Sequence, residues 1–116
     1  MKISHFTDIE PVPVTIEGVK NATMRVLIGK KDGAKNFVMR LFEIAPEGFT
    51  PFHQHDFEHE LFVIEGNGVL VTENKEIPFK AGSCLFVEAN EMHRFKNTCE
   101  GILKLICLIP AAYSSD

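Results

Sequence analysis

The sequence has no excess of basic residues, no long apolar run and no leader-like N-terminus. Its 116 residues include 12 Lys and Arg against 16 Asp and Glu, a net charge of −4. A nucleic-acid partner usually requires a basic face, so we expect none; the only basic doublet, Lys30-Lys31, is typical of a solvated turn. No stretch approaches the ~20 apolar residues that a membrane-spanning helix needs, so we expect no membrane partner. The residues after Met1 form no continuous apolar segment, so we expect no secretory signal. We therefore predict that the protein is cytoplasmic.

Cysteines are few, and their spacing does not indicate paired sulfur chemistry. The three, Cys84, Cys99 and Cys107, are odd in number and contain no Cys-x-x-Cys pair. Each lies in or beside an apolar run, which is typical of reduced and mostly buried thiols. We therefore expect neither a disulfide framework nor sulfur ligands to a metal.

Helical patterns are also nearly absent, and the chain divides into many short strand-like runs. This predicts a single all-β domain, a sandwich or barrel with little or no helix. We expect an extended N-terminal arm over residues 1–22, a barrel over residues 23–110 and a frayed tail over residues 111–116. A turn is expected at 46–48, and Gly66-Asn67-Gly68 is typical of a hairpin between the strands on either side.

Four of the five histidines form one spaced constellation, comprising His53, His55, His59 and His93. The first two are two residues apart and point to the same face of an extended strand. His59 has the same strand parity as these two, and His93 lies in a second strand-like run. Neutral imidazole is the commonest protein ligand of divalent transition metals. The constellation therefore predicts a metal site.

Two motifs that include these histidines resemble those of the cupin family. The first comprises Gly48, His53, His55, His59 and Gly66, and the second comprises Gly82, His93 and Asn97. In the second motif Glu88 and Asn90 replace the usual Pro and Gly of a turn, but Asn tolerates the left-handed conformation that Gly supplies. The resemblance covers roughly residues 23–110 and implies a double-sheet jelly roll.

The acidic ligand position of the first motif is where the chain departs most from the family. Counting six residues back from Gly66 leads to His59, and the adjacent Glu60 has the opposite strand parity. A four-histidine site is the primary prediction, and three histidines with Glu60 the alternative. Such donors suit a divalent transition metal, which could be Mn, Fe, Zn, Ni, Co or Cu.

The predicted function follows from the charge of this site. Four neutral ligands leave a dication uncompensated, which favours a small oxygen-chelating anion as its partner. Arg40 could clamp a carboxylate if its strand face is inward, and Glu60 could act as a general base if it turns inward. We therefore expect a metal-dependent enzyme (a dioxygenase, isomerase or lyase); the alternatives are a metal-containing binding or sensing module without turnover, and a structural metal barrel.

The run Ile102–Ile109 is too apolar for a strand with one face in water. One face can fill the barrel, and the other can pack on a second subunit. We therefore predict a homodimer, with cover by the N-terminal arm as the alternative.

Overall fold

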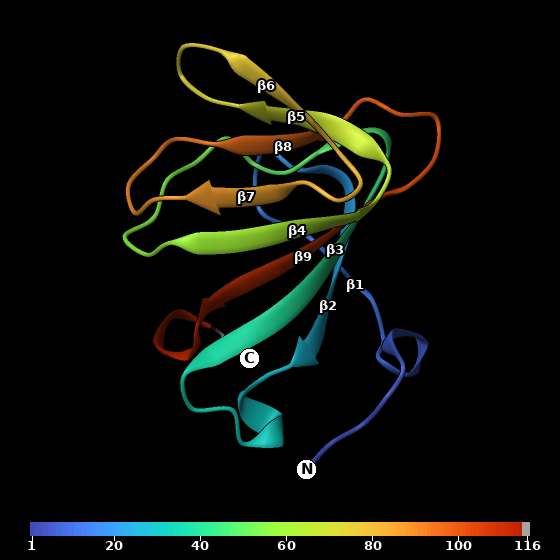
Figure 1. Ribbon diagram of the computed structural model, residues 1–116, viewed down its shortest axis with the longest axis vertical. Helices are drawn as coiled ribbons and strands as arrows, with labels where there is room; N and C mark the ends of the chain where they lie inside the picture. Colours follow the sequence, from blue (N-terminus) through green and yellow to red (C-terminus); the bar gives the residue numbers. More distant parts are fainter. Residues whose placement is uncertain (115–116) are drawn as a thin grey trace.

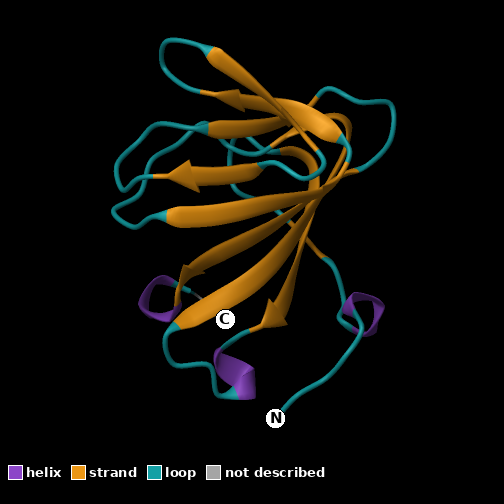
Figure 2. Cartoon of the chain, in the orientation of Figure 1, coloured by secondary structure: helices purple, strands orange, loops and turns teal. Residues whose placement is uncertain are grey.

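The computed structural model describes residues 1–114, and within that range it contains nine strands, three single-turn 3-10 helices and no α-helix (Figures 1 and 2). The strands are β1 (Val12–Pro13), β2 (Lys20–Ile28), β3 (Phe37–Phe49), β4 (His59–Glu65), β5 (Asn67–Val71), β6 (Glu76–Lys80), β7 (Cys84–Val87), β8 (Arg94–Asn97) and β9 (Leu103–Pro110). The short helices are η1 (Phe6–Asp8), η2 (Lys30–Asp32) and η3 (Ala111–Tyr113). The predicted all-β class is confirmed.

All strand pairs are antiparallel, and the sheet curls back on itself (Figure 1). The hydrogen-bonded order is β6-β5-β8-β3-β9-β4-β7, with β2 also on β3 and β1 on β2. The long strand β3 joins the two layers, because its last residue, Phe49, pairs with Lys96 of β8 while its earlier part pairs with β2 and β9. The result is the double-sheet jelly roll that the sequence predicts.

Strict alternation along β9 shows why the layers enclose a core. Leu103, Leu105, Cys107 and Ile109 are buried, and the residues between them are only partly covered. Successive side chains of a strand point to opposite faces, so one apolar face fills the barrel. The core that they join includes Val38, Ile44, Leu61, Val63, Phe79 and Phe95.

The predicted turn at 46–48 is wrong, because β3 continues through it. The pairing of β2 with β3 jumps from Ala22–Ile44 to Lys20–Phe49, so β3 bulges between these two pairs. Glu47 adopts a positive φ of 66° within this bulge. The extra residues bend β3 where it passes from one layer to the other.

The predicted hairpin at residues 66–68 is also wrong. Strand β4 pairs with β7 and β9, whereas β5 pairs with β6 and β8, so the link between them crosses from one layer to the other. Gly66 makes this crossing at a φ of 88°, and a Cβ there would lie 3.0 Å from the Ile102 carbonyl oxygen. The hairpin in this region is β5–β6, closed by the Thr72 N–H donating to the Lys75 carbonyl at 2.9 Å.

The N-terminal arm packs along the barrel. Its turn η1 is held by Arg25, whose Nη1 donates to the carbonyls of Phe6 (3.2 Å) and Ile9 (2.6 Å), and β1 extends the sheet on β2. At the other end, η3 follows β9 directly and Ala111 is buried. The predicted tail, residues 111–116, begins with this turn, and its last two residues lie outside the described part; the division into arm, barrel and tail stays a prediction. In residues 1–114 no helix has the length and apolar character needed to cross a membrane.

Candidate metal centre

Main-chain hydrogen bonds join the two histidine segments, although they are far apart in the sequence. His53 and His93 form an antiparallel bridge, in which each N–H donates to the other's carbonyl at 3.2 and 2.9 Å. The Asn90 N–H donates to the His55 carbonyl at 2.7 Å, and Thr50 forms a further pair of bonds with Phe95. Asn90 has a φ of 68°, the left-handed conformation expected of it. These contacts fix the loop before β4 against the loop before β8.

The four predicted histidines lie together inside the barrel. The ligand nitrogens of His53, His55 and His93 are all within 4.8 Å of one another. The His59 ring lies 4.3 Å from the His55 ring and 5.4 Å from the His93 ring, centroid to centroid, and the Nε2 atoms of His59 and His55 face each other. His59 opens β4 and is 6% exposed.

Hydrogen bonds at Nδ1 orient three of the four rings. His55 Nδ1 donates to the Phe57 carbonyl at 2.9 Å, and His93 Nδ1 donates to the Glu91 carbonyl at 2.7 Å. His59 Nδ1 lies 2.8 Å from the Sγ of Cys107. A ring that donates from Nδ1 keeps Nε2 as its lone-pair donor, which is the arrangement common in histidine metal ligands. The Nε2 atoms of His55 and His93 are thus available to an ion.

The environment keeps these imidazoles neutral. Burial, with the neighbouring His93, His55 and Arg40 adding to it, lowers the pKa of His53 to about 4 from the ordinary 6.5. Burial is also the main cause that lowers the pKa of His55, His59 and His93. Because a metal must displace any proton from its ligand, a neutral set is ready to bind at neutral pH. The donor set therefore fits a divalent transition metal.

Arg40 faces the histidines and has no acidic partner. Its Nη2 lies 3.1 Å from Cys107 Sγ, its guanidinium lies 5.1 Å from the Phe42 ring, and its Nε is buried without a hydrogen-bond partner. Among residues 1–114 no carboxylate lies within salt-bridge distance of it. Arg40 is half-buried, and its guanidinium, which lacks a carboxylate partner, can pair with an anion that enters the site.

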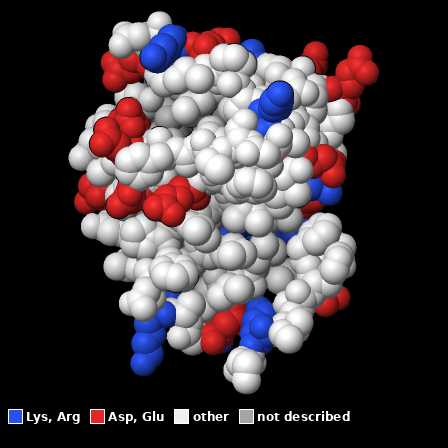
Figure 3. Space-filling model, in the orientation of Figure 1, with Lys and Arg blue, Asp and Glu red and all other residues white. Residues whose placement is uncertain are grey.

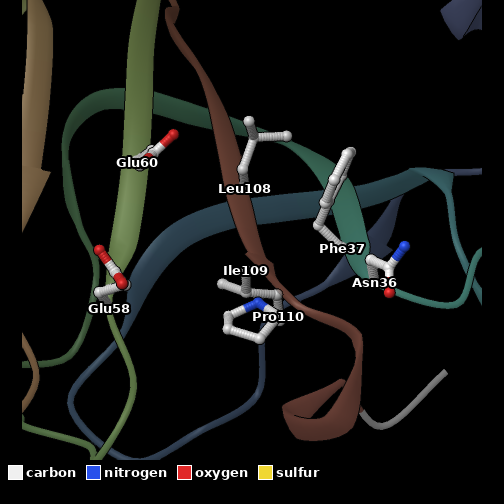
Figure 4. A pocket seen from close by; sticks show the side chains of 7 residues that line it. All are labelled: Asn36, Phe37, Glu58, Glu60, Leu108, Ile109 and Pro110. Carbon is white, nitrogen blue, oxygen red and sulfur yellow. The ribbon is translucent and has the colours of Figure 1, made fainter.

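Glu60, by contrast, lies on the outer face of β4. It is exposed between two buried neighbours, and it lines an outer groove with Glu58, Phe37 and Leu108 (Figure 4). Strand alternation puts His59 inside and Glu60 outside. The structure therefore brings Arg40 to the histidines and does not bring Glu60 to them.

A cavity of about 370 Å³ adjoins the four histidines, and Arg40 forms part of its wall. Much of the remaining wall is apolar, from Phe42, Phe57 and Phe95 and from residues 12–16 of the N-terminal arm. This size falls within the range of about 300–1,000 Å³ that is usual for small-molecule sites.

Sequence reasoning missed Cys107 as a site residue. Among the three cysteines, Cys84 is exposed and Cys99 half-buried, whereas Cys107 is 0% exposed and contacts both Arg40 and His59. Burial raises the pKa of the Cys107 thiol, and the Arg40 guanidinium opposes this shift. Its inward parity on β9 was visible in the sequence, but the pairing of β9 with β3, which sets Cys107 opposite Arg40, was not.

Comparisons with known proteins agree with the fold. Residues 40–109 match the family model described as a cupin domain, which is more than half of the chain. The protein therefore belongs to the cupin family.

Two solved structures have similar folds. A polyketide cyclase, RemF from Streptomyces resistomycificus, superposes with a TM-score of 0.90 at 34% identity, over 96% of this chain and 80% of that one. A predicted oxalate decarboxylase from Thermotoga maritima superposes with a TM-score of 0.82 at 25% identity, over 94% of this chain and 98% of that one.

Curated relatives match over part of their length only. An oxalate-binding protein from Thermotoga maritima is 31% identical over 74 residues, which is 60% of this chain and 61% of that protein. Auxin-binding protein 1 from Arabidopsis thaliana is 29% identical over 66% of this chain and 43% of its own length. This chain thus spans less than two thirds of either relative.

Proposed function

We propose that this cupin is an enzyme that holds one divalent transition metal on His53, His55, His59 and His93 and acts on a small oxygen-chelating anion. The observation that carries the proposal is the convergence of neutral imidazoles in one cavity with a guanidinium that has no carboxylate partner among residues 1–114. Mn, Fe, Zn, Ni, Co and Cu all suit these nitrogen donors. Bound there, the metal would supply Lewis-acid or oxygen-activating chemistry.

The protein's own groups have separate parts in this proposal. Cys107 and the carbonyls of Phe57 and Glu91 hold the imidazole rings in orientation. Arg40 binds the negative charge of the anion, and its guanidinium lies over the Phe42 ring. The aromatic wall excludes water, which strengthens these charge interactions. No described acid inside the cavity offers itself as a general base, so Glu60 has no part in the proposal.

The comparisons support this substrate class. Two similar proteins have names that refer to oxalate, which is a small chelating dianion. A metal held by four neutral donors favours a ligand of this kind. The name of RemF supports turnover, and therefore an enzyme of the dioxygenase, isomerase or lyase type. The alternative, a binding module without turnover, is supported by the name of the oxalate-binding protein.

The experiment is calorimetric titration of the zinc-loaded protein with oxalate and with 2-oxoglutarate. We expect both to bind, and Arg40→Met to weaken binding by about 1.5–3 kcal/mol, the value of a hydrogen bond to a charged group. Arg40→Lys, which keeps the charge, is the matched control and should lose less. Equal affinity in the wild type and Arg40→Met would remove Arg40 from the proposal.

We also propose that the protein is a homodimer. The outer face of β4, β7 and β9 exposes Phe62 (47%) and Phe86 (56%) beside a groove of about 390 Å³ that Ile106 and Leu108 line. Figure 3 shows a broad central area without charged side chains, with acidic side chains at several places around its edge. The arm does not cover Phe62 and Phe86, although its Phe6 ring lies 5.4 Å from the Lys104 Nζ on β9. The cytoplasmic location stays a prediction.

A further inference from the structure

A second cavity adjoins the one that holds the histidines. It has a volume of about 600 Å³ and is bounded by the N-terminal arm, β2, η2, β3, β9 and η3. Its wall carries charged side chains (Lys2, Glu10, Lys31 and Asp32) besides apolar ones. Val26, Ile109 and Tyr113 belong to its wall and not to that of the histidine cavity. Four residues, Val12, Met24, Arg40 and Phe57, line both cavities. The two spaces are therefore neighbours that share a wall of side chains.

That shared wall is built from groups that can yield to a ligand or stack on one. Met24 and Arg40 are long side chains on neighbouring strands, and Met is unbranched and adaptable. Phe57 stacks on His55 with centroids 4.0 Å apart and planes 8° apart, and on Tyr113 at 4.7 Å and 24°. A row of three rings thus runs from a proposed metal ligand to the second cavity.

The histidine cavity is larger than a two-carbon dianion alone would fill, and most of its wall is apolar. The histidine cavity, at about 370 Å³, has the volume of roughly a dozen water molecules at about 30 Å³ each. Apart from the histidines, Arg40 and two threonines, its wall is apolar or aromatic. A small anion would leave much of this wall without a ligand contact, whereas a ligand with an apolar body would cover it.

We propose that the substrate is an extended, ring-bearing molecule with chelating oxygens at one end. The head meets the histidines and Arg40, and the flat apolar body passes along the Phe57 ring into the second cavity toward Tyr113. This inference rests on the proposed metal function and specifies its substrate class. Flat rings suit this path, because edge-to-face contacts with the row of aromatic side chains add to the area that is buried.

The test uses three probes that share one chelating head. These are salicylate, 3-hydroxy-2-naphthoate and 3-hydroxyanthracene-2-carboxylate, titrated into the zinc-loaded protein whose metal content is measured in the same samples. We expect affinity to rise about tenfold with each added ring, since each ring buries further apolar surface. Val26→Phe, which fills the second cavity away from the histidines, should abolish the gain for the third ring and leave salicylate binding unchanged.

Tyr113→Ala is the second variant, because Tyr113 is 49% exposed and its truncation does not open the core. It should weaken the three-ring probe several-fold and leave salicylate and zinc content unchanged. Zinc-loaded protein that binds salicylate but gains nothing from added rings would overturn the extended substrate and leave the proposed metal function standing. A protein that retains no zinc would overturn both.

Discussion

Replacing Cys107 tests whether the sulfur organises the site. The Cys107 Sγ contacts both Arg40 Nη2 (3.1 Å) and His59 Nδ1 (2.8 Å), and Cys107 has no solvent exposure. Cys107→Val keeps an apolar side chain of similar size and removes the acceptor. Arg40 Nη2 and His59 Nδ1 then lose their sulfur contact.

The magnitude follows from those two contacts. An unsatisfied buried donor costs about 1–3 kcal/mol, and sulfur is a weak acceptor, so each loss belongs near the lower limit. We expect the free energy of unfolding of the metal-free protein to fall by about 2 kcal/mol in Cys107→Val. Cys107→Ser, whose hydroxyl still accepts, should lose about half as much. Zinc affinity should fall about 10- to 100-fold in Cys107→Val, as is usual when a group behind a ligand is removed.

Urea unfolding measures the first quantity and competition with a chromophoric chelator the second. Cys84→Val, at an exposed position, is the matched control and should change neither. The reasoning is refuted if Cys107→Val unfolds within about 0.5 kcal/mol of the wild type, the range of an ordinary surface substitution, and binds zinc equally tightly.

Three further predictions follow from burial and charge. In the unfolded chain His53 takes up a proton near pH 6.5, whereas in the folded chain it does so only near pH 4. The free energy of unfolding of the metal-free protein should therefore fall as the pH drops from about 6.5 to about 4. A stability that is constant or rises on acidification contradicts this prediction. Asn97→Ala should lower the free energy of unfolding in urea by about 2–4 kcal/mol. The Asn97 Nδ2 donates to the Ile44 and Gly101 carbonyls at 2.9 Å, and its Oδ1 accepts from the Cys99 N–H at 2.7 Å. A loss below about 1 kcal/mol would show these bonds to be dispensable. Phe86→Lys should shift the protein from dimer to monomer in light scattering, whereas Ile3→Lys on the exposed arm should not; a monomeric wild type refutes the proposed dimer.

The strands could be predicted because their signal is local. Alternation along β9 and the apolar run in β3 follow from side chains that must be buried on one face or both. The hairpin at Gly66 was predicted wrongly, because a glycine at positive φ serves a hairpin and a crossing between layers equally well. Only the pairing of β4 with β9 distinguishes the two, and pairing depends on distant parts of the chain.

The site divides in the same way. His53, His55 and His59 lie within seven residues, so their spacing alone predicts that they share a site. Their link to His93 was predicted from the similarity to the two cupin motifs. Parity left open whether Arg40 points inward, and register settles it, since Arg40 lies opposite Cys107 on β9. The parts that distant segments contribute, namely Cys107, the arm and Tyr113, carry no local signal that joins them to the histidines.

Metal content of the wild type and of single histidine variants tests the central claim most directly. Elemental analysis of protein purified with zinc should find about one metal per chain in the wild type. His5→Ala is the control, because His5 is exposed in the arm and bonded to Thr7. The account predicts full metal in His5→Ala and loss of metal in both His93→Ala and His59→Ala, with circular dichroism showing the folded barrel in each. Full retention in His93→Ala would contradict the site, and full retention in His59→Ala alone would reduce it to three histidines.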